Sequence, residues 1–126
     1  MKILFSFIAL LLLFTGCNTS DELAFYNALE KNNAPELERI LKKHPEYANP
    51  VINTESSDRM TPLHDAVNKG YAESAEILLK YGANIEETDQ NSNTALDLAK
   101  KSNNKKMMEL LKKHGAKERG AADQKL

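Results

Sequence analysis

The sequence contains no tryptophan, a single cysteine and few aromatic residues. One cysteine excludes an intramolecular disulfide bond, and with it the small secreted folds that disulfides hold together. The chain also lacks a glycine-rich phosphate-binding loop and a pair of cysteines at metal-binding spacing. Neither nucleotide nor zinc chemistry is therefore indicated, and no cofactor is expected. The formal net charge of −1 gives no global indication of nucleic-acid binding.

The longest apolar stretch is too short to cross a bilayer as an ordinary transmembrane helix. It runs from Ile3 to Phe14 and has 12 residues, with Ser6 as its only polar member. As a helix it would span about 18 Å, whereas a bilayer core is about 30 Å thick. Because Lys2 precedes this stretch and small residues follow it, the pattern indicates a secretory signal peptide over residues 1–16.

The single cysteine directly follows this segment. The stretch Leu13-Phe14-Thr15-Gly16-Cys17 resembles the lipobox of bacterial lipoproteins. The resemblance implies that the Cys17 thiol is lipidated, that the chain is cut before it, and that residues 17–20 form a lipidated tether. It also implies the cell envelope, at the outer membrane facing the periplasm or, in a Gram-positive host, at the plasma membrane surface. The alternative is a free cysteine behind an ordinary signal peptide.

The rest of the chain contains an internal repeat of 33 residues. The segment TPLHDAVNKGYAESAEILLKYGAN begins at Thr61, and it aligns without a gap with TALDLAKKSNNKKMMELLKKHGAK, which begins at Thr94. The coinciding pairs are Thr61/Thr94, Leu63/Leu96, Ala66/Ala99, Glu76/Glu109, Leu78/Leu111, Gly82/Gly115 and Ala83/Ala116. A period of this length is typical of solenoid proteins.

Each copy of the repeat predicts a pair of short helices. Thr61 can cap a helix whose first residue is Pro62, because a missing N–H costs nothing at that position. Gly70 permits a turn into a second helix, and Gly82 supplies the left-handed residue that ends it.

The next copy makes two substitutions that keep the same plan. Asp97 replaces His64, which gives Thr94 and Asp97 the spacing of a capping box. Asn103 replaces the turn glycine and is tolerated there, because asparagine enters left-handed conformations.

The repeat is similar to the ankyrin repeat. The residues that carry the resemblance are Thr61, Pro62, Leu63, His64, Ala66, Gly70, Leu78, Leu79, Gly82, Thr94, Leu96, Ala99, Leu111 and Gly115. It implies an all-α solenoid of about three helix-turn-helix repeats with short β-finger loops. The repeats are expected at about 21–50, 58–90 and 91–117 in a domain over 21–116, followed by a flexible tail over 117–126.

An earlier copy of the repeat is degenerate. Ala28 aligns with Ala66, and Ile40-Leu41 aligns with Ile77-Leu78, when one residue is allowed to slip. This copy lacks the Thr-Pro-Leu-His start and is predicted to cap the N-terminal end of the stack. The predicted helices of all three copies are 22–31, 35–44, 62–69, 72–81, 95–101 and 105–113.

Two patterns that imitate chemical sites are better explained by structure. His64 and Asp65 are adjacent, so they do not face each other on a helix, and no matched nucleophile accompanies them. The resemblance implies that this histidine braces neighbouring repeats. The segment from Asp89 imitates a calcium loop, but Lys100 stands where the last ligand belongs.

Two further pairs have structural explanations. His44 and His114 end second helices two repeats apart, about 20 Å at ordinary helix spacing, so no shared metal is predicted. There a cation complements the helix dipole. Met107 and Met108 are interpreted as flexible core filler rather than as a binding surface.

Charge is unevenly distributed along the chain. Residues 17–99 carry 7 Lys and Arg against 15 Asp and Glu, whereas residues 100–126 carry 9 against 3. One interpretation is a solvated terminal repeat. The other is a basic patch for an acidic partner or for anionic head groups.

The predicted function is recognition of a protein partner by the rigid concave face of an ankyrin solenoid. The family's contact positions transfer to Ser57, Asp58, Met60, Asn68, Lys69, Tyr81, Thr88, Gln90, Asn91, Asn93, Lys101, Ser102 and His114. In the degenerate copy, Glu30, Lys31 and His44 also transfer. Tyr81 and Met60 are the predicted anchors.

Several roles remain open within and beyond this class. The chain is expected to be a membrane-anchored, non-enzymatic monomer that binds no nucleic acid. An immunity or inhibitor protein against a periplasmic toxin is the first alternative, and an accessory subunit of an envelope complex is another. A small enzyme or metal carrier is the alternative from a different class.

Overall fold

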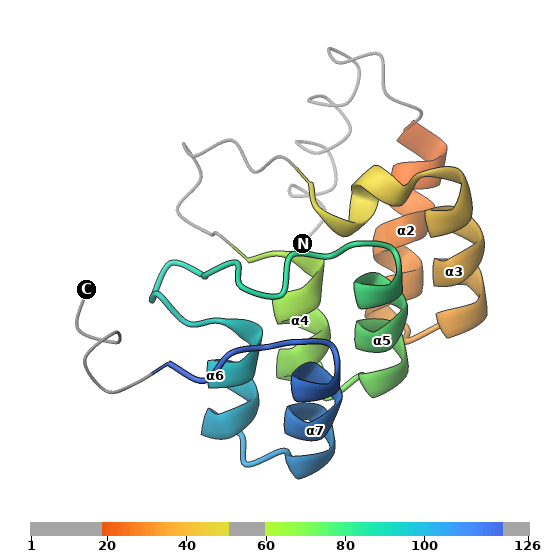
Figure 1. Cartoon of the computed structure of the whole chain (residues 1–126). Coiled ribbons are helices and arrows are strands. Elements are labelled where there is room, and N and C mark those ends of the chain that lie inside the picture. The colour runs from red at the N-terminus through yellow and green to blue at the C-terminus, as the bar shows by residue number, and fades with distance from the viewer. Residues whose placement is uncertain (1–18, 51–59, 120–126) are drawn as a thin grey trace, which may run out of the picture.

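A computed structural model describes residues 19–50 and 60–119 of the chain (Figure 1). These residues form six α-helices and one 3-10 helix. The elements are α2 (Thr19–Glu30), α3 (Ala34–Lys43), η1 (Pro45–Ala48), α4 (Pro62–Lys69), α5 (Ala72–Lys80), α6 (Ala95–Lys101) and α7 (Lys105–Lys113). Cys17, Ser57 and Asp58, which the sequence analysis singles out, lie outside the described residues.

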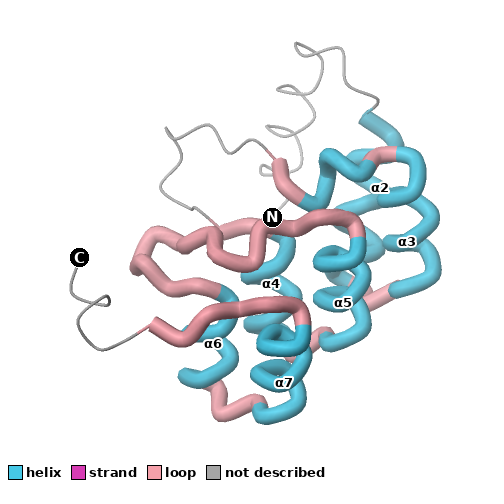
Figure 2. Tube along the Cα trace, viewed as in Figure 1, coloured by secondary structure: helices cyan, strands magenta, loops and turns pink. Residues whose placement is uncertain are grey.

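The helices pack as pairs, and the pairs stack. Helix α2 contacts α3, α4 contacts α5, and α6 contacts α7. Between pairs, α4 contacts α6, and α5 contacts both α3 and α7, so first and second helices form separate rows (Figure 1). In the described ranges, the segments that join the pairs contain no strand; they are loops, apart from η1 after α3 (Figure 2). The predicted all-α ankyrin solenoid is confirmed.

The starts of the first helices follow the predicted caps. Thr61 Oγ1 accepts a hydrogen bond from the His64 N–H, and the His64 ring accepts one from the Thr61 N–H, which completes a capping box. Thr94 and Asp97 form the same reciprocal pair at the start of α6. The substitution of aspartate for histidine therefore preserves the cap.

The turns between paired helices use left-handed residues, as predicted. Gly70 has φ of 74° and Asn103 has φ of 53° at equivalent places. Asn32 has φ of 51° at the corresponding turn of the first pair, which the degenerate sequence does not reveal. Asparagine adopts this conformation more readily than other residues with a Cβ, because its side chain can hydrogen-bond locally.

The core runs through all three helix pairs. Leu37, Leu63, Leu78, Leu96 and Leu111 are at most 2% exposed. The predicted core filler is confirmed for the two methionines, because Met107 is fully buried and Met108 packs partly buried against the same cluster. Leu79 is partly buried, so it lies at the margin of the core.

The first pair is joined to the second by polar contacts as well as by packing. Ser74 Oγ donates to Asn32 Oδ1 at 2.7 Å. Asn49 Oδ1 accepts from the Asn84 N–H at 2.7 Å, while the Asn49 amide donates to the Gly82 carbonyl. These bonds satisfy loop groups that would otherwise be left without partners where two repeats meet.

Two segments of the first pair differ from the sequence expectation. Helix α2 begins at Thr19, so Thr19 and Ser20, which were assigned to the tether, lie in its first turn. The 3-10 helix η1 follows α3, between the predicted helices 35–44 and 62–69 where no helix was expected, because Pro45 suits the first position of a helix. None of the helices in residues 19–50 and 60–119 has the length and hydrophobicity needed to span a bilayer.

Candidate functional site

The finger between α5 and α6 is held rigid by one aspartate. Asp89 Oδ1 accepts hydrogen bonds from the N–H groups of Asn91 and Asn93, both at 2.9 Å. The Asp89 N–H donates to the Asn93 carbonyl at 2.9 Å, so the finger closes on itself. The Asp89 carboxylate therefore binds backbone N–H groups of its own finger, which is the role of a turn residue rather than of a calcium ligand. No group of three metal-ligating side chains occurs in the part of the chain that the structure describes.

His64 ties this finger to the preceding helix. The ring is 1% exposed, and its Nε2 lies 3.0 Å from the Glu87 carbonyl. Because Nδ1 accepts from the Thr61 N–H, Nε2 is the nitrogen that donates. Burial lowers the pKa of His64, so the neutral ring that this network requires is favoured. The predicted bracing role is therefore seen as a bond from α4 to the finger that leads into the next repeat.

The predicted contact residues fall into two groups. Met60, Asn68, Lys69, Thr88, Gln90, Asn91, Asn93, Lys101 and Ser102 lie on the finger or on the flanks and ends of α4 and α6. We call this set the finger face. Met60 is 40% exposed, while Asn93 is only 9% exposed. Lys69 forms an ion pair with Asp65 at 3.1 Å, and Ser102 Oγ donates to helix carbonyls.

Tyr81 and His114 belong to the other group, because they end second helices. Tyr81 is half-buried, and its hydroxyl donates to Glu38 of α3 at 3.4 Å. It also packs against the core, so replacing it would alter stability as well as any surface contact. His114 is the exposed C-cap of α7. In the first pair, His44 contacts Asp21 and stacks on Tyr47, so it too has a structural role.

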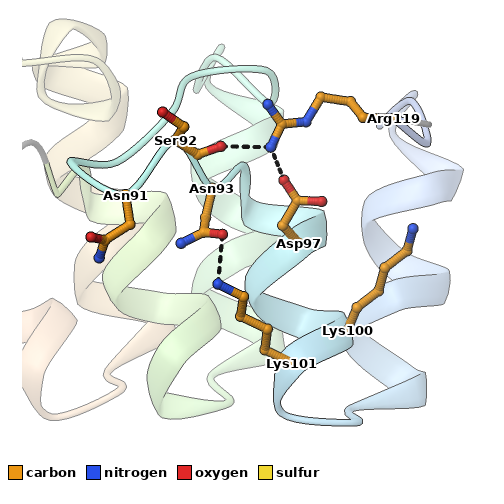
Figure 3. Close-up of a pocket in the computed structure, with 7 residues that line it drawn as sticks. All are labelled: Asn91, Ser92, Asn93, Asp97, Lys100, Lys101 and Arg119. Atoms are coloured by element: carbon orange, nitrogen blue, oxygen red, sulfur yellow. Dashed lines mark hydrogen bonds and ion pairs between the residues drawn. The ribbon is translucent and has the colours of Figure 1, made fainter. Parts of the chain in front are cut away.

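A pocket of about 300 Å³ lies where the finger face meets the last repeat (Figure 3). Its lining residues are Asn91, Ser92, Asn93, Asp97, Lys100, Lys101 and Arg119. Three of them, Asn91, Asn93 and Lys101, were predicted contact positions. The long Lys101 side chain reaches from the end of α6 to the finger, where its Nζ donates to Asn93 Oδ1 at 2.8 Å.

Arg119 closes one side of the pocket from beyond α7. Its Nη2 donates to the Ser92 carbonyl at 2.6 Å and forms an ion pair with Asp97 (Figure 3). Burial raises the pKa of Asp97, but hydrogen bonds from Thr94 and Arg119 outweigh it, so the net pKa lies below the ordinary value. Asp97 is therefore an ionised carboxylate at neutral pH, and its Oδ2 accepts from both Thr94 and Arg119.

The segment carrying Arg119 was expected to be a flexible tail. Instead, the Lys117 N–H donates to Glu86 at 2.9 Å, and Glu118 bridges Lys100 and Lys112 at 3.3 and 2.7 Å. Residues 117–119 pack against the stack because Glu86, Lys100, Lys112 and Asp97 supply their hydrogen-bond and ion-pair partners. Residues 120–126 lie outside the described part.

A comparison of the second and third repeats could have predicted that residues 118 and 119 pack against the stack. The positions of His64, Val67 and Leu79, which are buried or partly buried in the second repeat, hold Asp97, Lys100 and Lys112 in the third. We call the face that carries these three charges the end face. When several positions that face the neighbouring repeat are charged in one repeat and uncharged in the repeat before it, that repeat has the features of the last one in a stack. The need for counter-charges then indicates that Glu118 and Arg119 fold back.

Comparison with known proteins identifies the repeats. The family model described as "Ankyrin repeats (3 copies)" matches residues 5–89 and 25–119. The chain is 33% identical over 85 residues to serine/threonine-protein kinase VIK of Arabidopsis thaliana, a match that covers 68% of this chain and 18% of the kinase. It is 42% identical over 66 residues to the nuclear factor NF-kappa-B p105 subunit of Gallus gallus, covering 52% of this chain and 7% of that protein.

A third relative is potassium channel GORK of Arabidopsis thaliana, with 39% identity over 59 residues, 47% of this chain and 7% of the channel. The chain therefore spans less than a fifth of each of these relatives, so the activities of the whole proteins do not transfer with the match. What they share with it is a short region that the fold and the family match identify as repeats. The chain belongs to the ankyrin-repeat family, whose stacked helix pairs serve typically as non-catalytic modules for protein–protein interaction.

Proposed function

We propose that this chain is a lipid-anchored protein-binding module of the bacterial envelope, and that its partner docks on the finger face. One observation carries the binding part of the proposal. Asn91, Asn93 and Lys101 come from a finger and from the far end of a helix, yet they line one pocket. The finger is braced by Asp89 and His64, so a partner meets donors and acceptors that are already fixed in place. Preorganisation of this kind lowers the entropy cost of binding.

The anchor part of the proposal is supported by the sequence. Cys17 follows a signal-like apolar segment, and a lipid on its thiol would leave no free reactive thiol in an exported protein with a single cysteine. Helix α2 begins at Thr19, two residues later. With so short a tether, the first helix pair stays next to the membrane, and the finger face is presented to partners in the adjoining compartment.

The replacement Cys17→Ser tests the anchor and the binding role together. The native protein should fractionate with membranes as a processed, acylated chain. From solubilised membranes it should co-purify with a specific protein in stoichiometric amount. The Cys17→Ser chain should appear as an unprocessed precursor or as a released soluble protein.

A processed and membrane-bound Cys17→Ser chain would contradict the lipid anchor. Native protein that purifies alone from cross-linked host membranes would contradict the binding role. Metal analysis of the same preparation addresses the remaining class, because a metal carrier would contain a stoichiometric ion.

A further inference from the structure

The two ends of the solenoid differ in charge. Residues 17–99 have an acidic excess, whereas residues 100–126 have a basic excess. In the described residues, the basic excess belongs to the end of α6, to α7 and to the segment after it, at one end of the stack, whereas the acidic excess is spread over the first two helix pairs and the finger between α5 and α6 (Figure 1). A field of this kind orients an approaching charged partner before contact is made. An acidic partner is therefore steered to the third repeat.

Most of the acidic groups near this end are already paired. Glu118 binds Lys100 and Lys112, and Asp97 binds Arg119. Within the described residues, Lys101 has only a neutral partner, the amide oxygen of Asn93. Lys101 is therefore the cation of the pocket that lacks a counter-charge there.

The pocket has the chemistry of a site for a negative charge. Three cations line it; Asp97 offsets Arg119, and Glu118 is shared between Lys100 and Lys112, so Lys101 is the lining cation that has no carboxylate partner. Asn91 is exposed beside it and can donate from its amide. A lysine flanked by neutral amide donors suits a carboxylate, which can accept a hydrogen bond at each of its two oxygens.

Anionic lipid is the other natural ligand for a basic surface, but the geometry disfavours it. The lipid-bearing residue of the proposed function precedes α2, at the far end of the stack from α6. Two repeats separate these ends, a distance of about 20 Å at ordinary helix spacing. The pocket therefore lies at the end of the stack that is remote from the anchor.

We infer that the pocket formed by Asn91, Asn93 and Lys101 receives the carboxylate of a Glu or Asp side chain from an acidic protein partner. Lys101 Nζ donates to one carboxylate oxygen, and the Asn91 amide donates to the other. Arg119 holds the finger in place through the Ser92 carbonyl. This inference rests on the proposed function, because it names the chemistry of the partner for the same face.

A peptide titration tests the inference without knowledge of the partner. The full acylated chain in neutral bicelles is labelled with ¹⁵N and titrated with acetyl-Gly-Glu-Gly-amide. The side-chain amide signals of Asn91 and Asn93 should shift saturably, with the weak affinity expected of one charged contact. The matched peptide acetyl-Gly-Gln-Gly-amide should leave them unchanged. Lys101→Gln should weaken binding by about tenfold, because it removes a charge-assisted hydrogen bond.

The control variant is Lys105→Gln, which changes net charge equally but lies at the start of α7, outside the pocket lining. It should bind the Glu peptide as the native chain does. Equal responses to the Glu and Gln peptides, or no response, would overturn the inference. So would stronger binding of inorganic phosphate, or pocket shifts induced by phosphatidylglycerol in the bicelles without peptide. Each failure would leave co-purification of a partner, and hence the proposed function, standing.

Discussion

At the scale of single residues, one position shows how a repeat adapts to its place in the stack. In the second repeat, His64 reaches the Glu87 carbonyl of the next finger. In the third repeat the same position is Asp97, and it meets the guanidinium of Arg119. Both residues keep the capping bond to the threonine before them. A neutral donor suits a carbonyl partner, and a carboxylate suits a cation, so the partner dictates the residue.

His64 makes stability sensitive to mild acid. Burial lowers the pKa of His64 in the folded chain, whereas the unfolded chain titrates near the ordinary value of about 6.5. Below that value the unfolded state binds more protons than the folded state, so stability falls as pH falls. We expect a loss of up to about 1.4 kcal/mol per pH unit below pH 6.5, which His64→Gln abolishes. Urea unfolding between about pH 5 and 7.5 measures it. Parallel pH profiles for the two proteins would contradict this role.

At the scale of helices, the leucines of the repeat are the main stacking contacts. Leu78 and Leu111 occupy equivalent places on α5 and α7, and both are 0% exposed. Helix α5 contacts α3 and α7, so Leu78 lies in a helix with a neighbour on both sides, whereas α7 has a neighbour on one side in the described stack. Each short helix depends on this burial, because helices of this length are marginal by themselves.

Leu78→Ala and Leu111→Ala should each cost about 2–5 kcal/mol, because each leaves a cavity in a packed core. A domain of this size has roughly 5–15 kcal/mol of stability in total, so partial unfolding at room temperature is expected. Circular dichroism during urea unfolding provides the measurement. The control is Glu73→Ala with Glu76→Ala on the exposed side of α5, which should change stability by less than about 0.5 kcal/mol. Losses below about 1 kcal/mol at both leucines would mean that the stacking register is wrong.

Sequence reasoning succeeded where local chemistry decides the structure. The limits of α4, α6 and α7 agree with the predicted 62–69, 95–101 and 105–113, because Thr61, Thr94 and the turn residues mark them. Sequence reasoning was less successful where the structure depends on residues that are distant in the chain. The packing of residues 117–119 depends on Lys100, Lys112 and Asp97, and the half-burial of Tyr81 at the end of α5 depends on α3, where it contacts Glu38. Contacts between repeats of this kind leave little trace in a linear pattern.

At the scale of the whole molecule, ion pairs between the end face and residues 118 and 119 cover the last helix pair of the described stack. We call these ion pairs the charged closure. The end face carries charges where the second repeat has His64, Val67 and Leu79, and the following segment supplies opposite charges. Arg119 spans the finger and α6, so it joins the candidate pocket to the stability of the last repeat. The same contacts therefore complete the fold and position the binding surface.

Arg119→Ala should destabilise the third repeat by about 1–3 kcal/mol, because Asp97 is 8% exposed and loses its cationic partner. Hydrogen exchange should show α6 and α7 opening more readily, with little change in α2 and α3. The matched control is Lys117→Ala. Within the described residues, the Lys117 hydrogen bond to Glu86 uses the backbone N–H, which the substitution keeps. Identical exchange in the Arg119→Ala and native chains would show that the closure contributes nothing to the repeat.

The position of the partner on the molecule is tested most directly by photo-cross-linking in the native host. A benzophenone amino acid is introduced into the full chain at Gln90 or Ser102 on the finger face, or at Glu76 or Glu109 on the second helices. All four side chains are exposed, so the substitutions should be tolerated. We predict a discrete cross-linked protein from Gln90 and Ser102, rich in acidic residues at the point of attachment, and none from Glu76 and Glu109. A specific product from the second-helix positions alone would contradict recognition through the finger face.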